Sequence, residues 1–129
     1  SWENLAPPPE APKCFSVVLK KASRKLFVLE EKCSDLVIQE LSLDELTWRT
    51  IRPRWEGKEI HRWVDHPSSN LILFIVMKSN ICALNAEAPN KVRKVGEVCH
   101  LYGECFATEG SLVLIGEEGR MAQYELTLA

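Results

Sequence analysis

Eleven short strand-like segments follow one another along the chain, and this recurrence limits the fold more than any other feature of the sequence. Each segment is apolar or alternates apolar with polar residues, and turn-forming residues such as His66-Pro67-Ser68-Ser69-Asn70 separate them. Helical periodicity is nearly absent, and even Leu41–Leu46 is better explained as a strand end that runs into an acidic turn. The expected strands are Cys14–Lys20, Lys25–Glu30, Leu36–Leu43, Thr47–Ile51, Ile60–Val64, Leu71–Met77, Ile81–Ala86, Val92–Val95, Glu104–Thr108, Ser111–Gly116 and Met121–Leu128. This pattern predicts an all-β fold, which could be a sandwich, a barrel or a propeller.

An internal repeat separates these three architectures. Most of the matching positions recur at offsets of 43 and 40 residues, and those of the first strand in each group recur at offsets of 45 residues. A sandwich needs no such period, whereas each propeller blade is one four-stranded unit of roughly 40–50 residues. The repeat therefore favours a propeller. The positions that coincide are Ile38, Ile81 and Met121; Leu41, Leu84 and Tyr124; Leu43, Ala86 and Leu126; and, two strands earlier, Phe15, Ile60 and Cys105.

The strands fall into three successive repeats, with the strands of each repeat named A to D from the inside outward. Residues 14–58 form repeat 1 and residues 59–103 form repeat 2, each with four strands. Residues 104–129 form an incomplete repeat 3 that lacks strand D. Propellers have four to eight blades in most examples, so three blades are expected to be half of a six-bladed ring. The remaining blades would come from another chain or from a second copy of this one.

The first residues of the chain resemble a strand D, the strand that repeat 3 lacks, and could belong to repeat 3 or to a blade of another chain. Trp2 coincides with Trp48 at an offset of 46 residues, and each tryptophan precedes a proline-containing link into a strand A. We therefore expect residues 1–13 to be an orphan outer strand followed by a link. Proline is tolerated there because one edge of an outer strand is unpaired. On this interpretation Trp2 is buried against a blade.

These repeats resemble the kelch repeat. The likeness is carried by Trp2 with LAPPPEAP and by LFVLEE…LVIQELSLDELTW at residues 26–48, in which Leu41 takes the place of the aromatic residue that precedes the tryptophan. Tyr124 in RMAQYEL takes the same place in repeat 3. The family's double glycine after strand B is replaced, by Glu30-Glu31 in the first repeat, and no tryptophan marks strand D of the second. A WD40-like or other propeller stays open as the alternative.

Composition excludes several classes of function. The net charge is −2 with both signs interspersed, which predicts no nucleic-acid partner and no anionic membrane surface. The longest apolar run, Leu71–Met77, is too short to span a bilayer, and no signal-peptide pattern opens the sequence. The five cysteines are odd in number and contain no CxxC pair, so we expect reduced thiols and a cytoplasmic or nuclear location.

No motif predicts catalysis. Cys99, His100 and Cys105 are zinc-ligand types, but their spacing does not fit a structural zinc site. Adjacent residues in a strand point to opposite faces, so His100 would not activate Cys99 as a nucleophile. No phosphate-binding glycine loop, carboxylate pair or G-x-S-x-G motif is present. We therefore expect no enzyme activity, no metal and no cofactor.

The links between strands are the candidate binding surface. In a propeller the D-to-A and B-to-C links lie on one face, and here they contain residue types that are enriched at binding hot spots. The alternative to partner binding is a structural role, in which Trp55 packs against a blade and the arginines are solvated. The candidate partner-binding residues are Arg52, Arg54, Trp55, His100, Tyr102 and Arg120.

The predicted function is non-catalytic recognition of a protein or peptide, with an acidic degron as one candidate. Many kelch propellers are substrate receptors of cullin-RING ubiquitin ligases, and the resemblance implies that role here. The alternative is a structural half-propeller that self-associates or pairs with another chain as a scaffold subunit. An enzyme with a metal in the central channel is a third hypothesis.

Overall fold

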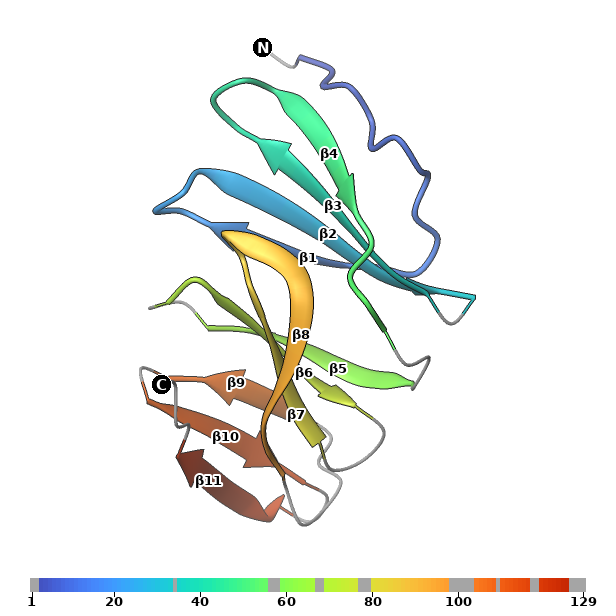
Figure 1. Cartoon of the computed structure of the whole chain (residues 1–129). Helices are drawn as coiled ribbons and strands as arrows, with labels where there is room; N and C mark the ends of the chain where they lie inside the picture. Colours follow the sequence, from blue (N-terminus) through green and yellow to red (C-terminus); the bar gives the residue numbers. More distant parts are fainter. Residues whose placement is uncertain are drawn as a thin grey trace. The chain divides into compact units, whose positions relative to one another are not determined.

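The computed structural model describes residues 3–33, 35–55, 59–66, 69–76, 80–97, 104–108, 110–116 and 119–125. These residues form eleven β-strands in three antiparallel sheets, which confirms the all-β prediction (Figure 1). Sheet A has the order β1-β2-β3-β4, sheet B has the order β5-β6-β7-β8, and sheet C has the order β11-β10-β9. The strands are β1 Ser16–Lys20, β2 Lys25–Lys32, β3 Asp35–Ser42, β4 Thr47–Ile51, β5 Ile60–Asp65, β6 Leu71–Val76, β7 Asn80–Asn85, β8 Ala88–Glu97, β9 Glu104–Ala107, β10 Ser111–Ile115 and β11 Met121–Glu125.

Every expected strand segment coincides with one of these strands, although the ends differ. The strand expected from Cys14 begins at Ser16, and the strand expected over Val92–Val95 extends over Ala88–Glu97. The second difference arises because β8 is an edge strand whose exposed positions are mostly polar, so its ends carry no apolar alternation. The stretch Leu41–Leu46 is a strand end followed by a turn, as expected.

The chain divides into two compact units, Ser1–Gly57 and Lys58–Ala129. The first unit contains sheet A, and the second contains sheets B and C. In the second unit, one face of sheet B packs on one face of sheet C. The buried residues of this core are Val64, Leu73, Ile75, Ile81 and Ala83 from sheet B and Leu112 and Leu114 from sheet C.

The internal repeat is visible in the register of the sheets. In each sheet, the second and fifth residues of the second strand lie opposite the two third-strand residues that the sequence alignment matches. The matching pairs are Leu26–Leu41 and Leu29–Ile38 in sheet A, Ile72–Leu84 and Ile75–Ile81 in sheet B, and Leu112–Tyr124 and Ile115–Met121 in sheet C. One match in the first strands differs from the sequence alignment. Cys105 lies opposite Leu114 in sheet C, and Val17 lies opposite the equivalent residue of sheet A, Val28. Cys105 is therefore equivalent to Val17, whereas the sequence alignment matched it with Phe15.

The segment before β1 differs from the expected outer strand. Residues 3–15 form no strand, and Figure 1 shows them passing beside β4 before they turn towards β1. Pro7, Pro8, Pro9 and Pro12 have no backbone N–H, so this segment cannot sustain a strand ladder. We call residues 3–15 the strap. Trp2, which was expected to be buried, lies outside the described residues.

Candidate protein-interaction site

The strap lies over one face of sheet A, which we call the strap face. This face carries Val28, Glu30, Val37, Gln39 and Leu41, because side chains at alternate positions of a strand share a face and the pairing aligns these residues. Gln39 is 1% exposed and Glu30 is 5% exposed. Buried polar side chains need hydrogen-bond partners, and the strap backbone provides them.

Three side chains of sheet A bind the strap backbone at successive points. The indole Nε1–H of Trp48, on β4, donates to the carbonyl oxygen of Ala6 at 2.8 Å. On β3, the Gln39 amide accepts from the N–H of Glu10 at 2.9 Å and donates to its carbonyl at 2.8 Å. On β2, the Glu30 carboxylate accepts from the N–H groups of Lys13 and Cys14 at 2.9 and 3.3 Å.

The three points lie on a diagonal of the sheet. Trp48 of β4 lies opposite Leu41 of β3, and Gln39 is two residues before Leu41. Glu30 of β2 lies opposite Val37, which is two residues before Gln39. Each step therefore crosses one strand spacing and two residues, roughly 8 Å in total. The strap thus crosses the sheet obliquely from β4 to β2 before it enters β1.

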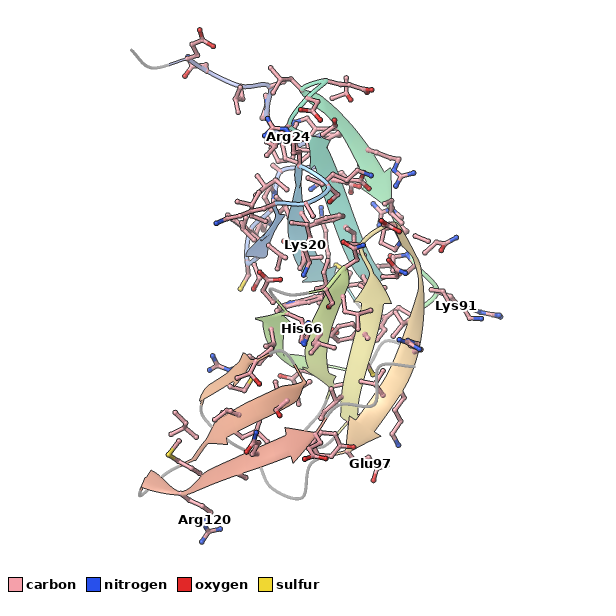
Figure 2. The ribbon with its side chains drawn as sticks, turned by 90° about the vertical axis from the view of Figure 1, so that its left-hand side faces the viewer. Lys20, Arg24, His66, Lys91, Glu97 and Arg120 are labelled. Carbon is pink, nitrogen blue, oxygen red and sulfur yellow. The ribbon has the colours of Figure 1, made fainter. Side chains whose placement is uncertain are left out.

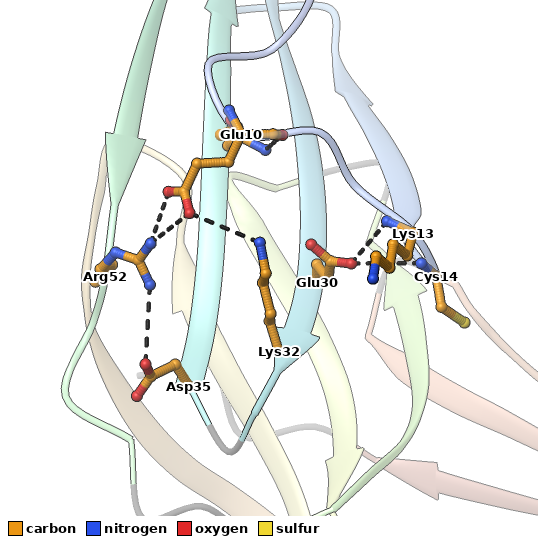
Figure 3. A network of polar contacts seen from close by, with 8 residues as sticks. Glu10, Lys13, Cys14, Glu30, Lys32, Asp35 and Arg52 are labelled. Carbon is orange, nitrogen blue, oxygen red and sulfur yellow. Dashed lines mark hydrogen bonds and ion pairs between the residues drawn. The ribbon is translucent and has the colours of Figure 1, made fainter.

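A charged cluster holds the strap at the end of sheet A where its links meet (Figure 3). The Arg52 guanidinium binds both carboxylate oxygens of Glu10 at 2.5 and 2.7 Å. The Lys32 amine lies 4.0 Å from the same carboxylate, and Arg52 lies 3.9 Å from Asp35. These residues come from the strap, from the end of β2 and the start of β3, and from the residue that follows β4. Since two acids face two bases, the cluster has no formal excess charge.

The structure places the predicted site residues in different settings. Arg52 is half-exposed, but Glu10 occupies its guanidinium, so it serves the strap contact. Arg54 is exposed and Trp55 is half-buried, both in the link that follows β4. Arg120 is exposed beside β11 in the second unit, as Figure 2 shows. His100 and Tyr102 lie outside the described residues.

The sequence reasoning missed the polar residues of the strap face. Gln39 stands between buried neighbours in β3, and Glu30 follows the buried Leu29 in β2. A buried strand is normally a continuous apolar run, so polar interruptions in VLEEK and VIQEL were the available signal. Trp48 was recognised as a repeat position, but its hydrogen bond to Ala6 could not be seen without the path of the strap.

A second buried acid lies on the opposite face of sheet A. Glu40 is paired with Lys25 at 2.9 Å and with Arg49 at 2.7 Å. Burial alone would raise the pKa of the Glu40 carboxyl, but the hydrogen bonds and charges of Lys25 and Arg49 outweigh it and lower the pKa. Glu40 is therefore ionised at neutral pH and fixes β4 to the centre of the sheet.

Cys14, Cys33, Cys82 and Cys105 are reduced, and Cys99 lies outside the described residues. Among the residues that the structure describes, no group of three or more His, Cys, Asp or Glu is placed to hold a metal ion. That part of the chain also contains no helix long and apolar enough to cross a bilayer.

Comparison of the chain with protein-family models, with curated proteins and with solved structures gave no match. The resemblance to kelch repeats therefore rests on the residues and the repeat alone.

Proposed function

We propose that sheets A, B and C are successive blades of a kelch-type β-propeller and that the chain is a non-catalytic protein-recognition module. The observation that carries this proposal is the repeated register of the three sheets, in which equivalent residues pair with equivalent residues. The simple strand order, in which each strand pairs with its neighbour in the chain, also fits propeller blades.

The face formed by the links is the proposed recognition surface. In sheet A the strap, the β2–β3 connection and the exit of β4 meet at one end, in agreement with the arrangement expected for a blade. Arg54 extends this surface as an exposed cation beside the half-buried Trp55. Tryptophan and arginine couple large contact area with directional hydrogen bonds, which suits an acidic peptide.

The resemblance to kelch proteins extends the proposal to a biological role. In that role the chain is the substrate-binding part of a cullin-RING ubiquitin ligase adaptor in the cytoplasm or nucleus. This extension depends on the family resemblance.

Charge reversal tests the recognition surface. An array of acidic peptides is screened with the wild-type chain, and the bound peptides are titrated against Arg54→Glu/Arg120→Glu. We expect a loss of at least about tenfold in affinity, since two attractive charges become repulsive. The control is Lys21→Glu/Lys91→Glu, which reverses one exposed cation in each unit. Absence of any bound peptide, or an equal loss in the control, contradicts the proposal.

A second candidate function is a scaffold that pairs with another copy of itself. The observation that favours it is the outer face of sheet C, where Met121 is 64% exposed and Val113 lies beside it. Light scattering of the wild-type chain should then show a dimer that Met121→Lys weakens. A monomer in the micromolar range excludes self-association as the function.

A further inference from the structure

We propose that the strap face of sheet A is a binding site for an extended, proline-rich peptide that carries a carboxylate. The strap occupies this site within the chain, and a partner protein with such a segment displaces it. The inference names a partner class for the recognition function proposed above, but it concerns sheet A alone.

The contacts of the site are those of a peptide receptor. All five hydrogen bonds from Trp48, Gln39 and Glu30 reach backbone atoms of the strap and none reaches a strap side chain. The Gln39 amide accepts from the N–H of Glu10 and donates to its carbonyl, as the backbone of a neighbouring strand would. The site therefore recognises an extended backbone, whichever protein supplies it.

The position of the prolines indicates the conformation that the site accepts. Ala6, whose carbonyl receives the Trp48 indole N–H, immediately precedes Pro7-Pro8-Pro9. A residue before proline is held extended, and a proline run adopts the polyproline II conformation with little entropy left to lose. Carbonyls in such a run lack internal partners, so an indole donor beside them is a suitable receptor group.

The charge at the middle point of the diagonal adds a sequence requirement. Glu10 follows the three prolines directly, and its carboxylate is held by Arg52 with Lys32 nearby. Arginine with a carboxylate is a strong and directional pair. A ligand with the pattern Pro-Pro-Pro-Glu therefore matches both the polyproline conformation and the charge.

The first part of the strap is lightly held. Residues 3–7 are exposed, and the Leu5 side chain is 54% exposed. In contrast, the receptor side chains Gln39 and Glu30 are buried beneath the strap. Because the strap is tethered, it acts at an effective concentration of the order of millimolar. A partner segment must therefore bind more tightly than the strap to displace it, and a peptide with the strap's own sequence competes well only when the strap is weakened.

The test uses the full chain with the strap disengaged. In Glu10→Arg the strap places a cation against Arg52 and Lys32, which should release it. The probe is a fluorescein-labelled peptide with the sequence of residues 3–13, ENLAPPPEAPK, followed by fluorescence anisotropy. We expect it to bind Glu10→Arg at least about tenfold more tightly than the wild-type chain, whose site is filled.

Receptor variants show where the peptide binds. In the Glu10→Arg background, Trp48→Phe should weaken binding by about five- to tenfold, the effect of one hydrogen bond. Gln39→Ala should weaken it further, and Thr47→Ala, an exposed neighbour of Trp48 on the other face of β4, should leave it unchanged. The single variant Arg52→Glu, which repels Glu10 of the strap, should instead prefer a peptide in which the glutamate is replaced by arginine.

Three results overturn the proposal. The first is no binding to folded Glu10→Arg up to about 1 mM peptide, and the second is binding that Trp48→Phe and Gln39→Ala leave intact. The third is a wild-type dimer in light scattering that Glu10→Arg dissolves, because the occupant would then be the strap of a second copy. If Glu10→Arg loses its circular dichroism spectrum, Glu10→Ala removes the ion pair without added repulsion and decides by the same titration. Failure here leaves the Arg54 and Arg120 experiment unaffected, since neither arginine belongs to the hydrogen bonds and ion pairs described for the strap.

Discussion

Sheets A and C present equivalent faces that are covered by different means. The register makes Leu41 equivalent to Tyr124 and Gln39 equivalent to Ala122. In sheet C this face packs on sheet B through apolar side chains, with Ala122 and Tyr124 at its margin. In sheet A the same face is crossed by the strap, and Gln39 binds its backbone.

The difference shows how one side chain can determine whether another sheet or a peptide segment packs on a face. A neighbouring sheet presents side chains, so a small apolar residue such as Ala122 suits it. A peptide strap presents backbone N–H and C=O groups, and these would be left unsatisfied against an alanine. Gln39 satisfies both groups of one residue, so the polar position specifies a strap where the apolar position specifies a sheet.

The largest expected effect on stability concerns the apolar contact between sheets B and C. Leu112 is fully buried between sheets B and C. We expect Leu112→Ala to lower the free energy of unfolding by about 2–5 kcal/mol, because lost burial and a cavity add together. Denaturant unfolding measures the change. Val113→Ala, on the other face of the same strand, is the control and should cost less than about 1.5 kcal/mol; equal losses would contradict the apolar cover of sheet C.

Gly96 tests how closely the two sheets approach. A Cβ at Gly96 would lie 2.7 Å from Cζ and 2.8 Å from Cε1 of the Tyr124 ring, closer than van der Waals contact allows. We expect Gly96→Ala to destabilise the protein by about 1–3 kcal/mol through overpacking. Gly110→Ala, where a Cβ meets nothing within 4 Å, is the matched control. In Tyr124→Leu the same glycine substitution should cost less, and an unchanged cost would show that the ring is not the obstacle.

The strands and their grouping into sheets could be predicted because apolar alternation and turn residues recur with the repeat. That alignment matched Leu41, Leu84 and Tyr124, and the structure places each of them opposite the second residue of the preceding strand. Cys105 was wrongly aligned with Phe15 and not with Val17, since a two-residue shift keeps the same face of the strand and leaves the pattern unchanged. In β5 a register shift between Ile60 and Arg62 further obscures the alignment.

The candidate site was harder to predict. Trp48 and the prolines were singled out, but as parts of a strand and its link. The path of the strap depends on hydrogen bonds between residues 29 and 42 positions apart, such as Gln39 with Glu10 and Trp48 with Ala6. Such long-range pairing leaves no periodic signal in the sequence. Arg52 was expected to face a partner, and its local sequence did not reveal that Glu10 would neutralise it.

A reciprocal exchange tests whether Gln39 determines that the strap packs on this face of sheet A. Gln39→Leu leaves the N–H and the carbonyl of Glu10 without partners, so we expect a loss of about 1–2 kcal/mol, with part of the cost offset by apolar burial. Amide hydrogen exchange at Glu10 should accelerate while the amides of β7 stay protected. Ala122→Gln makes the opposite change in sheet C and should also destabilise the protein. Stable Gln39→Leu with a protected Glu10 amide would refute this account of the strap.

The smallest expected effect concerns Glu40, the buried acid on the other face of sheet A. Because the folded protein lowers the pKa of this carboxyl, its contribution to stability is present above the ordinary pKa of glutamate and is lost as the pH falls through the lower folded value. Lys25 and Arg49 are partly exposed, so solvent screening limits the contribution to about 1 kcal/mol or less. Thermal unfolding from pH 7 to pH 3 should therefore show a smaller loss of stability in Glu40→Gln than in the wild-type chain. Identical pH profiles would show that the ion pairs of Glu40 contribute nothing, and would leave the strap contacts as the important polar interactions of sheet A.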